Sequence, residues 1–263
     1  MRAGFLQFSP VWGEKDENLA NIELSLSGLT SDLVVLPELC TTGYQLTREE
    51  ALFLGEPFPG GPTCDALVRI ARKLDSFLVA GVAERDGARV FNSAVLVGPE
   101  GHVATYRKAH LFAHETLAFD RADSPFAVHE VRGARVGMMI CFDWAFPEVA
   151  RSLALAGADL IAHPSNLVLP FCQRAMPVRC LENGVFAVTA NRVGTEDRLA
   201  GRPSLSFTGG SLIAGPRGEI LAQAGVSDAA FTFLELDPAR ARDKRITPLN
   251  DLLADRRCDL YRR

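Results

Sequence analysis

The chain has 263 residues, of which 48% are hydrophobic and 23% are charged, and its net charge is −4. This is the balance of an ordinary globular protein, long enough to bury a core without disulfides or metals. The small negative charge gives no electrostatic reason to expect nucleic acid or an anionic membrane as a partner. No uninterrupted apolar stretch approaches the ~20 residues that span a bilayer.

The N-terminus and the cysteines predict the compartment. The first residues, Met1 to Phe8, are too short and too interrupted for a signal peptide, and they favour a strand instead. The six cysteines show neither Cys-x-x-Cys pairing nor the density of a disulfide framework. Most of them are expected to be free thiols in a reducing compartment. These features predict a cytoplasmic protein.

Short apolar runs alternate with helical patterns along the chain, which favours an α/β layered fold. In chain order the pattern predicts a strand at 3–8, a helix at 18–27, a strand at 33–36, a helix at 64–74, and strands at 77–83, 90–97, 102–106 and 134–140. It then predicts a helix at 147–156, a strand at 160–163, a helix at 175–182, and strands at 185–190, 210–214 and 231–236. No linker or low-complexity tract divides the sequence, so we expect a single domain over residues 1–263.

Two short segments resemble each other. Residues 97–101 (Val-Gly-Pro-Glu-Gly) and 214–218 (Ala-Gly-Pro-Arg-Gly) each lie between two β-like runs. Proline presets φ for a turn and the later glycine tolerates positive φ, so both predict hairpins. Independent use of a good turn explains the likeness, but it also suggests two similar halves. Two such halves, stacked sheet on sheet, would form a four-layer α-β-β-α sandwich.

The first candidate for chemistry lies where the strand at 33–36 ends. The apolar run Val34-Val35-Leu36 leads through Pro37 directly to the carboxylate of Glu38. An apolar setting raises a carboxyl pKa and makes the group a better general base. Taken alone, a Glu after a strand is more often an ordinary loop residue.

The second candidate segment is residues 106–112, Tyr-Arg-Lys-Ala-His-Leu-Phe, which follows the strand predicted at 102–106. It places two cations beside aromatic and aliphatic side chains. Lys108, held there, would donate a hydrogen bond to an oxyanion. For the motif in isolation, a solvated basic patch with an extended lysine stem is the simpler interpretation.

The third candidate segment is residues 136–148, Val-Gly-Met-Met-Ile-Cys-Phe-Asp-Trp-Ala-Phe-Pro-Glu. Its apolar strand ends on Cys141, and a helix is predicted a few residues later. Such a turn presents the thiol at the sheet edge, near backbone N–H groups that favour a thiolate. The N–H of Phe142 would point toward charge developing on a bound carbonyl. Without this context, a cysteine is usually a small buried apolar residue.

In this order the three segments resemble the nitrilase superfamily of carbon–nitrogen hydrolases, and the resemblance covers nearly the whole chain. Its specific motifs are strand-Pro-Glu at 33–38, Tyr-Arg-Lys-x-His-Leu-Phe at 106–112 and Ile-Cys-Phe-Asp-Trp-x-Phe-Pro-Glu at 140–148. Residues 163–182 also look like this family, with His-Pro-Ser-Asn at 163–166 and Arg-Ala-Met-Pro at 174–177. The sequences of these motifs are closest to those of small microbial nitrilases and amidases.

The resemblance implies a role for each candidate. Cys141 is the nucleophile, forming a thioester from an amide or a thioimidate from a nitrile. Glu38 is the general base, and Lys108 orients the substrate and stabilises the oxyanion together with the N–H of Phe142. Glu115 matches the place of a second Glu that positions the lysine and shuttles a proton, unless it is a surface residue. A thiol, a carboxylate and an ammonium suffice for this chemistry, so no metal or organic cofactor is expected.

Three rival interpretations stay open at the level of sequence. His110 and His114 are four residues apart, as in a metal pair, but HExxH is absent and no third ligand is obvious. A papain-like Cys–His hydrolase would need its own signature around Cys141, which is lacking. A catalytically silent binding protein on the same fold should have lost a catalytic group, yet the thiol, the carboxylate and the ammonium all remain.

The substrate is less well defined. Many relatives carry Arg two residues after the Asp that follows the cysteine, and this chain has Ala145 there. The change removes a cation that would meet a substrate carboxylate. We therefore predict a small, uncharged or weakly polar aliphatic substrate, with Phe142, Trp144 and Asn166 among the residues that bind it. An amide, hydrolysed to a carboxylic acid and ammonia, is favoured over a nitrile, and N-carbamoyl compounds stay open.

The C-terminal residues 256–263 mix bulky apolar and basic groups. In members of the resembled family such tails reach across to a partner subunit. Residues 245–263 are therefore predicted to form a tail at the interface of a homodimer or larger homo-oligomer. A frayed terminus is the alternative.

Overall fold

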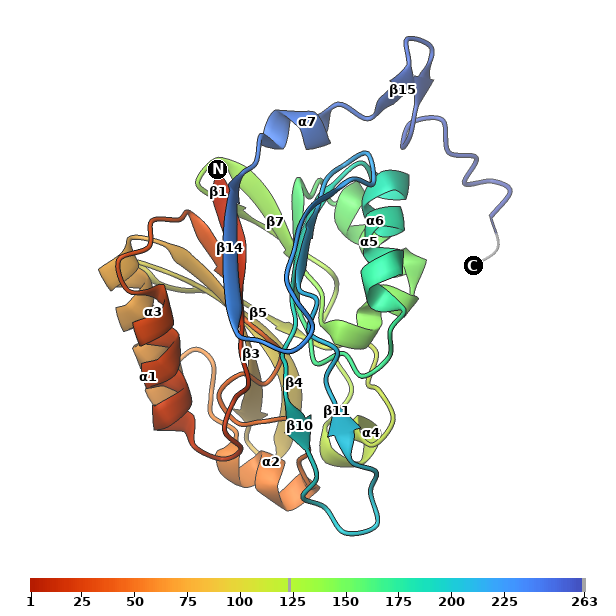
Figure 1. Cartoon of the computed structure of the whole chain (residues 1–263). Coiled ribbons are helices and arrows are strands. Elements are labelled where there is room, and N and C mark those ends of the chain that lie inside the picture. Colours follow the sequence, from red (N-terminus) through yellow and green to blue (C-terminus); the bar gives the residue numbers. More distant parts are fainter. Residues whose placement is uncertain (123, 262–263) are drawn as a thin grey trace.

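A computed structural model describes residues 1–122 and 124–261, and its two large sheets have six strands each (Figure 1). The first sheet has the order β14-β1-β2-β3-β4-β5, with a parallel centre and antiparallel pairs toward both edges. Its strands are β1 (Arg2–Gln7), β2 (Leu33–Val35), β3 (Phe77–Asp86), β4 (Arg89–Gly98), β5 (Gly101–Arg107) and β14 (Ala230–Glu235).

The second sheet has the order β13-β12-β9-β8-β7-β6 and the same plan, with parallel pairs in the middle and antiparallel pairs outside. Its strands are β6 (Val128–Val131), β7 (Ala134–Met138), β8 (Leu160–Pro164), β9 (Phe186–Ala190), β12 (Leu212–Ala214) and β13 (Ile220–Gln223). The two similar halves suggested by the repeated turn are therefore present, and both turns are hairpins, between β4 and β5 and between β12 and β13.

Helices cover the outer face of each sheet. Helices α1 (Lys15–Leu26) and α3 (Pro62–Leu74) lie on the first sheet, and α5 (Pro147–Leu155) and α6 (Cys172–Asn183) lie on the second (Figure 1). Alternation along β2 explains the layering, since successive side chains of a strand point to opposite faces. Val34 packs in the cluster that contains α1 and α3, whereas Leu33 and Val35 pack in the cluster shared with the second sheet. The predicted four-layer α-β-β-α sandwich is confirmed.

All the predicted strands and helices are present, but several short elements were missed. Edge strand β13 is implied by the predicted hairpin but received no bounds, because two of its four side chains are exposed and the strand shows no apolar alternation. Helix α2 was missed, although its capping box of Thr47 and Glu50 is a start signal visible in the sequence. The elements without predicted bounds are α2 (Arg48–Leu54), α4 (Glu115–Ala118), β6, β10 (Thr195–Glu196), β11 (Leu205–Ser206), β13, α7 (Pro238–Arg242), β15 (Arg245–Thr247) and β16 (Asn250–Asp251).

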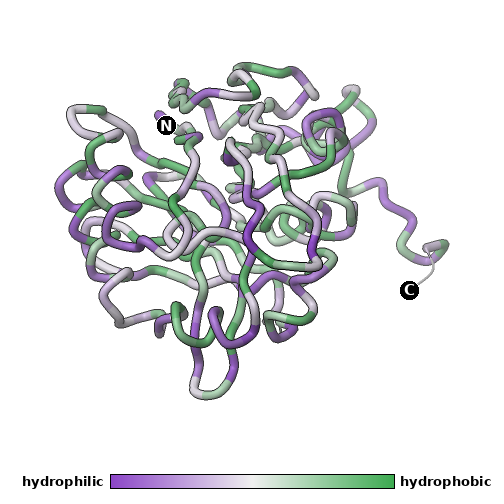
Figure 2. The backbone as a smooth tube through the Cα atoms, turned by 60° about the horizontal axis from the view of Figure 1, so that its bottom comes forward, coloured by the Kyte–Doolittle hydropathy of each residue, from purple (hydrophilic) through white to green (hydrophobic). Residues whose placement is uncertain are grey.

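The C-terminal part leaves the body of the molecule after β14. It runs through α7 and the small β15–β16 hairpin (Figure 1). The chain then projects from the body of the molecule toward the C-terminus, as Figure 2 also shows. The side chain of Lys244 fixes the start of this segment, since its Nζ donates to the carbonyl oxygens of Asn183 and Gly184 at 3.0 and 2.8 Å. Within the described residues, no helix combines the length and apolar character needed to cross a membrane.

Candidate active site

Glu38 lies just beyond β2 and is completely buried. Its Oε1 accepts hydrogen bonds from Lys108 Nζ at 2.6 Å and from Asn92 Nδ2 at 2.7 Å. Its Oε2 is buried and has no hydrogen-bond partner among the described residues. Burial raises the pKa of Glu38 above its usual value, the positive charge of Lys108 opposes this, and Glu115 adds to the rise. One carboxylate oxygen thus accepts two hydrogen bonds, and the other is available to accept a proton or a hydrogen bond.

Gly81 of β3 allows the loop of Glu38 to lie directly on the sheet. Its N–H donates to the Pro37 carbonyl at 3.1 Å, and its carbonyl accepts from the Cys40 N–H at 2.9 Å. A Cβ at this position would lie 2.3 Å from the Cα of Glu38, so a larger residue would displace the carboxylate. Sequence reasoning missed Gly81, although a glycine within a strand signals close approach of another backbone.

Lys108 follows β5, and its side chain is fully buried between two carboxylates. Its Nζ donates to Glu38 Oε1 at 2.6 Å and to Glu115 Oε1 at 2.8 Å. Burial by itself lowers the pKa of the ammonium, but the charges of Glu115 and Glu38 outweigh burial and raise it. Lys108 is therefore a permanent cation, and a solvated basic patch is the wrong interpretation of this segment.

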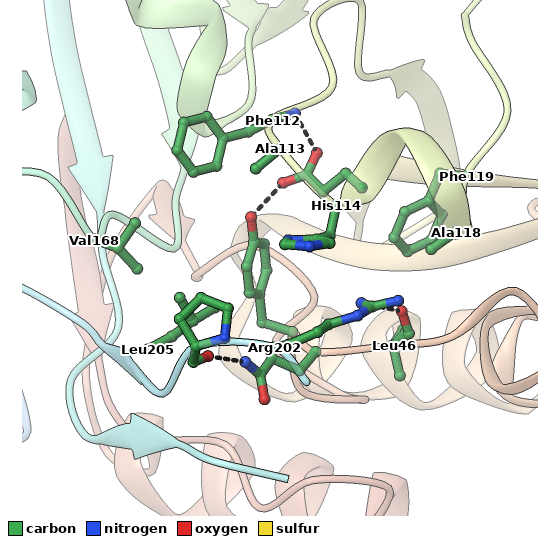
Figure 3. A pocket seen from close by; sticks show the side chains of 13 residues that line it. Leu46, Phe112, Ala113, His114, Ala118, Phe119, Val168, Arg202 and Leu205 are labelled. Carbon is green, nitrogen blue, oxygen red and sulfur yellow. Dashed lines mark hydrogen bonds between the residues drawn. The ribbon is translucent and has the colours of Figure 1, made fainter. Parts of the chain in front are cut away.

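Glu115 begins α4 and is buried, so its interpretation as a surface residue is also wrong. Besides Lys108, its Oε1 accepts from the Tyr44 hydroxyl at 2.7 Å, and its Oε2 accepts from the Phe112 N–H at 3.1 Å (Figure 3). Tyr44 is in turn held by its own N–H, which donates to the buried carboxylate of Glu196 at 3.0 Å. No local pattern pointed to Tyr44, because its partners come from distant parts of the chain.

Cys141 opens a short 3₁₀ turn, Cys141–Ala145, three residues beyond the end of β7. Its φ of 41° is in the left-handed region, which non-glycine residues adopt mainly where the surrounding structure imposes it. Burial raises the pKa of the thiol well above its usual value, the charge of Glu38 adds to the rise, and Lys108 opposes it. The expectation of a site that favours the thiolate was wrong, because one backbone N–H, from Asn166, does not offset burial and a neighbouring carboxylate.

Asp143 joins the cysteine turn to the lysine segment. Its Oδ2 accepts from the Tyr106 hydroxyl at 2.7 Å and from the Ile140 N–H at 2.9 Å. Its Oδ1 accepts from the His110 N–H at 3.1 Å and lies 2.8 Å from His110 Nδ1. The residues on both sides of Lys108 are thereby tied to the turn that carries Cys141. Across residues 1–122 and 124–261, no three His, Cys, Asp or Glu side chains are grouped to hold a metal.

Asn166 and His163 fix the backbones of the cluster. Asn166 Nδ2 donates to the Glu38 carbonyl at 2.9 Å, which links the loop after β8 to the loop after β2. His163 Nε2 lies 3.0 Å from the carbonyl oxygen of Cys141. Because burial lowers the pKa of His163 to about 4, the ring is neutral and donates to that carbonyl. His163 thus contacts the backbone of the cysteine, in contrast to the thiol-contacting His that a papain-like hydrolase requires.

Two cavities adjoin the cluster. A small one of about 20 Å³ is lined by Cys141 and by all three residues predicted to bind substrate, Phe142, Trp144 and Asn166. A larger one of about 260 Å³ is lined by Tyr44, Glu115 and side chains of α4 and the β10–β11 loop (Figure 3). Phe112 and Val168 line both, so the cavities lie next to each other.

Comparison with known proteins identifies the class. The profile of the carbon–nitrogen hydrolase family matches residues 2–245. A nitrilase from Pyrococcus abyssi is 45% identical over 265 residues, covering 99% of this chain and 99% of that protein. An (R)-stereoselective amidase from Pseudomonas sp is 34% identical over 254 residues, covering 93% of this chain and 88% of its own. The chain belongs to the carbon–nitrogen hydrolase family of the nitrilase superfamily.

Solved structures agree with this assignment. A carbon–nitrogen hydrolase from Helicobacter pylori G27 superposes with a TM-score of 0.90 at 26% identity, over 99% of this chain and 96% of its own. An amidase from Nesterenkonia sp. AN1 superposes with a TM-score of 0.77 at 26% identity, over 93% of this chain and 96% of its own. In that structure acrylamide has added to the active-site cysteine of the amidase. The predicted family, fold and enzyme class are all confirmed.

Proposed function

We propose that this carbon–nitrogen hydrolase converts small, uncharged aliphatic amides to carboxylic acids and ammonia through a thioester on Cys141. The observation that carries the proposal is the buried cluster around the thiol. Lys108 bonds to both Glu38 and Glu115, one oxygen of Glu38 stays available, and all three charges act on the Cys141 thiol. This set provides a nucleophile, a base and an oxyanion donor in one place that is shielded from water.

The first half of the reaction forms the acyl enzyme. Because its pKa is raised, the thiol stays protonated until Glu38 Oε2 takes the proton as sulfur attacks the amide carbon. Lys108 Nζ and the N–H of Phe142 stabilise the negative oxygen. Glu38 then gives its proton to the amide nitrogen, the C–N bond breaks, and ammonia leaves.

The second half returns the enzyme to its starting state. Glu38, again a carboxylate, takes a proton from water as the water oxygen attacks the thioester carbon. The C–S bond breaks, the acid leaves, and the proton on Glu38 returns to the sulfur. Glu115 holds Lys108 in place throughout, through its 2.8 Å bond to Nζ. These groups suffice for both steps, so the proposal includes no metal or organic cofactor.

A nitrile is the second candidate substrate, because the 45% identical relative from Pyrococcus abyssi is a nitrilase. The same thiol, carboxylate and ammonium would form a thioimidate from a nitrile. One water adds to the thioimidate and ammonia leaves, which gives a thioester that a second water hydrolyses to the acid and the free thiol. N-carbamoyl compounds are a third candidate, since an N-carbamoylputrescine amidase of Solanum lycopersicum is 29% identical. The amide is preferred because the Pseudomonas relative and the Nesterenkonia neighbour are both amidases.

A panel of amides, nitriles and N-carbamoyl compounds tests the proposal, with ammonia release and intact protein mass as readouts. We expect turnover of small aliphatic amides and a mass increase, equal to the acyl group, that maps to Cys141. Amides with an ω-carboxylate should react at least about tenfold more slowly, because Ala145 offers no cation for a charged end. Turnover of nitriles without turnover of amides would contradict the amide assignment, and a strong preference for ω-carboxylates would contradict the uncharged substrate.

We also propose that the C-terminal segment 245–263 docks on a second copy of the chain. The segment is tied to the end of α6 through Lys244 and then projects with large exposed side chains, including Leu249 at 91% exposure. Val178 and Leu181 of α6 are also exposed, at 50% and 47%. Apolar side chains exposed on both the helix and the tail are typical of a homo-oligomer interface.

Sedimentation of a chain truncated after Asn250 tests this proposal. We expect the full chain to sediment as a dimer or larger oligomer and the truncated chain to sediment as a smaller species, because the tail contacts are lost. Leu249→Glu should have the same effect. The control is Leu24→Glu, which places a charge on the exposed side of α1 at a residue that is 76% exposed. A full-length chain that sediments as a monomer would refute the proposal.

A cytoplasmic location is a further part of the proposal. All six cysteines are free, and Cys258 is exposed. An exposed unpaired thiol fits a reducing compartment, where disulfides rarely form. Recovery of the native protein with the membrane or the secreted fraction of its source cells would exclude that location.

A further inference from the structure

The larger cavity beside the site has no role in the reaction steps above. We propose that this cavity, called here the side cavity, binds the apolar carbon chain of the substrate, an inference that rests on the proposed amide hydrolysis. Its walls come from the segments around Tyr44, Glu115, Val168 and Leu205. It opens near the exposed residues Ala113, His114 and Pro203.

The Tyr44 hydroxyl, the Gln45 amide nitrogen and one N–H of Arg202 in the side cavity donate to protein acceptors (Figure 3). The Tyr44 hydroxyl donates to Glu115 at 2.7 Å, and Gln45 Nε2 donates to the Pro203 carbonyl at 2.9 Å. Arg202 Nη1 donates to the Leu46 carbonyl at 3.3 Å. The surface that faces the interior of the cavity is therefore mainly carbon, from aromatic rings and aliphatic side chains. Such a surface binds an apolar group more strongly than a charged one.

The position of the side cavity connects it to the chemistry. Phe112 and Val168 form a wall of this cavity and also a wall of the small cavity at Cys141. The ring of Phe112 packs at 5.0 Å from that of Phe142, whose N–H is proposed to bind the oxyanion. A substrate with its carbonyl carbon at Cys141 would therefore extend its chain past Phe112 and Val168 into the side cavity.

The volume sets the length of chain that fits. At about 260 Å³ the cavity lies just below the range of about 300–1,000 Å³ typical of sites for drug-sized ligands. This suits an acyl chain of several carbons better than the single carbon of acetamide. Leu205, at the start of β11, lines the cavity together with Ala118 of α4. Its size should therefore limit the chain length without affecting the thiol, the carboxylates or the lysine.

The test is a series of straight-chain primary amides from acetamide to octanamide, with kcat/KM as the readout. In the unmodified enzyme each added methylene should raise kcat/KM about fourfold until the cavity is full. Leu205→Trp should fill the cavity and reduce the ratio of kcat/KM for hexanamide to that for acetamide at least about tenfold. Leu205→Ala should shift the optimum to longer chains. A general folding defect would lower both rates together and leave the ratio unchanged.

The control and a binding measurement separate the possible results. Ser204→Trp places the same large residue on an exposed neighbour that does not line the cavity, and it should leave the chain-length profile unchanged. Calorimetric binding of the same amides to the Cys141→Ala variant should show the same chain-length dependence without turnover. An affinity that rises with chain length, without any hydrolysis, would overturn the proposed reaction and support the cavity assignment. Hydrolysis with a flat chain-length profile, or with preference for ω-carboxylated chains, would overturn the cavity assignment.

Discussion

A Cys141→Ser variant should lose at least about 10⁴-fold in kcat/KM toward the best amide and form no thioester detectable by intact mass. The serine hydroxyl is a far weaker nucleophile than sulfur, and its pKa is too high for Glu38 to remove the proton. The turn itself should survive, because Asp143 holds it through the Ile140 N–H and the Tyr106 hydroxyl. The thermal midpoint should therefore change little while the activity disappears.

The matched control is Cys64→Ser, which changes another buried cysteine, in the first turn of α3. Cys64 packs with the outer helices of the first sheet, in a different hydrophobic cluster from Cys141. The acyl adduct and the turnover should both persist in this variant. An adduct that maps to any cysteine other than residue 141 would invalidate the proposed mechanism.

The second large effect is expected from Glu38→Gln, which should lower kcat/KM by about 10²- to 10⁴-fold. Glutamine has nearly the same shape, but it cannot accept the proton of a thiol whose pKa is raised by burial. The loss should appear in formation of the acyl enzyme, so the intact-mass adduct should build up slowly or not at all. Glu148→Gln is the matched control, because Glu148 is exposed at the start of α5. Equal losses in the two variants would show that Glu38 has no special role.

The pH profile gives an independent readout of the same residue. Glu38 acts as a base only when ionised, and burial raises its pKa above the ordinary carboxyl value. In the unmodified enzyme kcat/KM should therefore fall as the pH decreases through this raised pKa. The fall should begin at a higher pH than for an exposed carboxyl group. In Glu38→Gln this acidic limb should vanish, whereas loss of activity through a folding defect would leave its position unchanged.

The order of the secondary structure and the candidate cluster followed from local features of the chain. Apolar runs of strand length, such as Val34-Val35-Leu36, stop at polar residues, and the periodicity needed to recognise them lies within a few residues. Glu38, Lys108 and Cys141 each follow such a strand. Rigid strands of stacked sheets end in loops at a shared edge, so side chains that follow them can meet there, as Lys108 and Glu38 do.

The parts of the site that the sequence did not reveal depend on contacts between segments far apart along the chain. Tyr44 bonds to Glu115, Asn92 bonds to Glu38, and Gly81 admits the Glu38 loop, yet none of these pairs is close in sequence. Asn92 lies in an apolar strand, and this was a usable signal, because buried amides need hydrogen-bond partners. The sequence did not indicate which residue the partner is. Packing of the two sheets decides the partner.

The protonation state of the cysteine and the shape of the substrate site also depend on contacts between segments that are far apart along the chain. Local sequence around Cys141 suggested a thiolate, whereas burial and the charge of Glu38 keep the thiol protonated. Alternation and turn residues act over a few bonds, so the chain alone determined the layered fold and the family, and it predicted the reacting groups. Desolvation, charge pairing and cavity volume are sums over neighbours from many segments. Only the tertiary structure therefore determined which Glu38 oxygen lacks a partner among the described residues, in which direction burial shifts the pKa of the Cys141 thiol, and which side chains line the cavities.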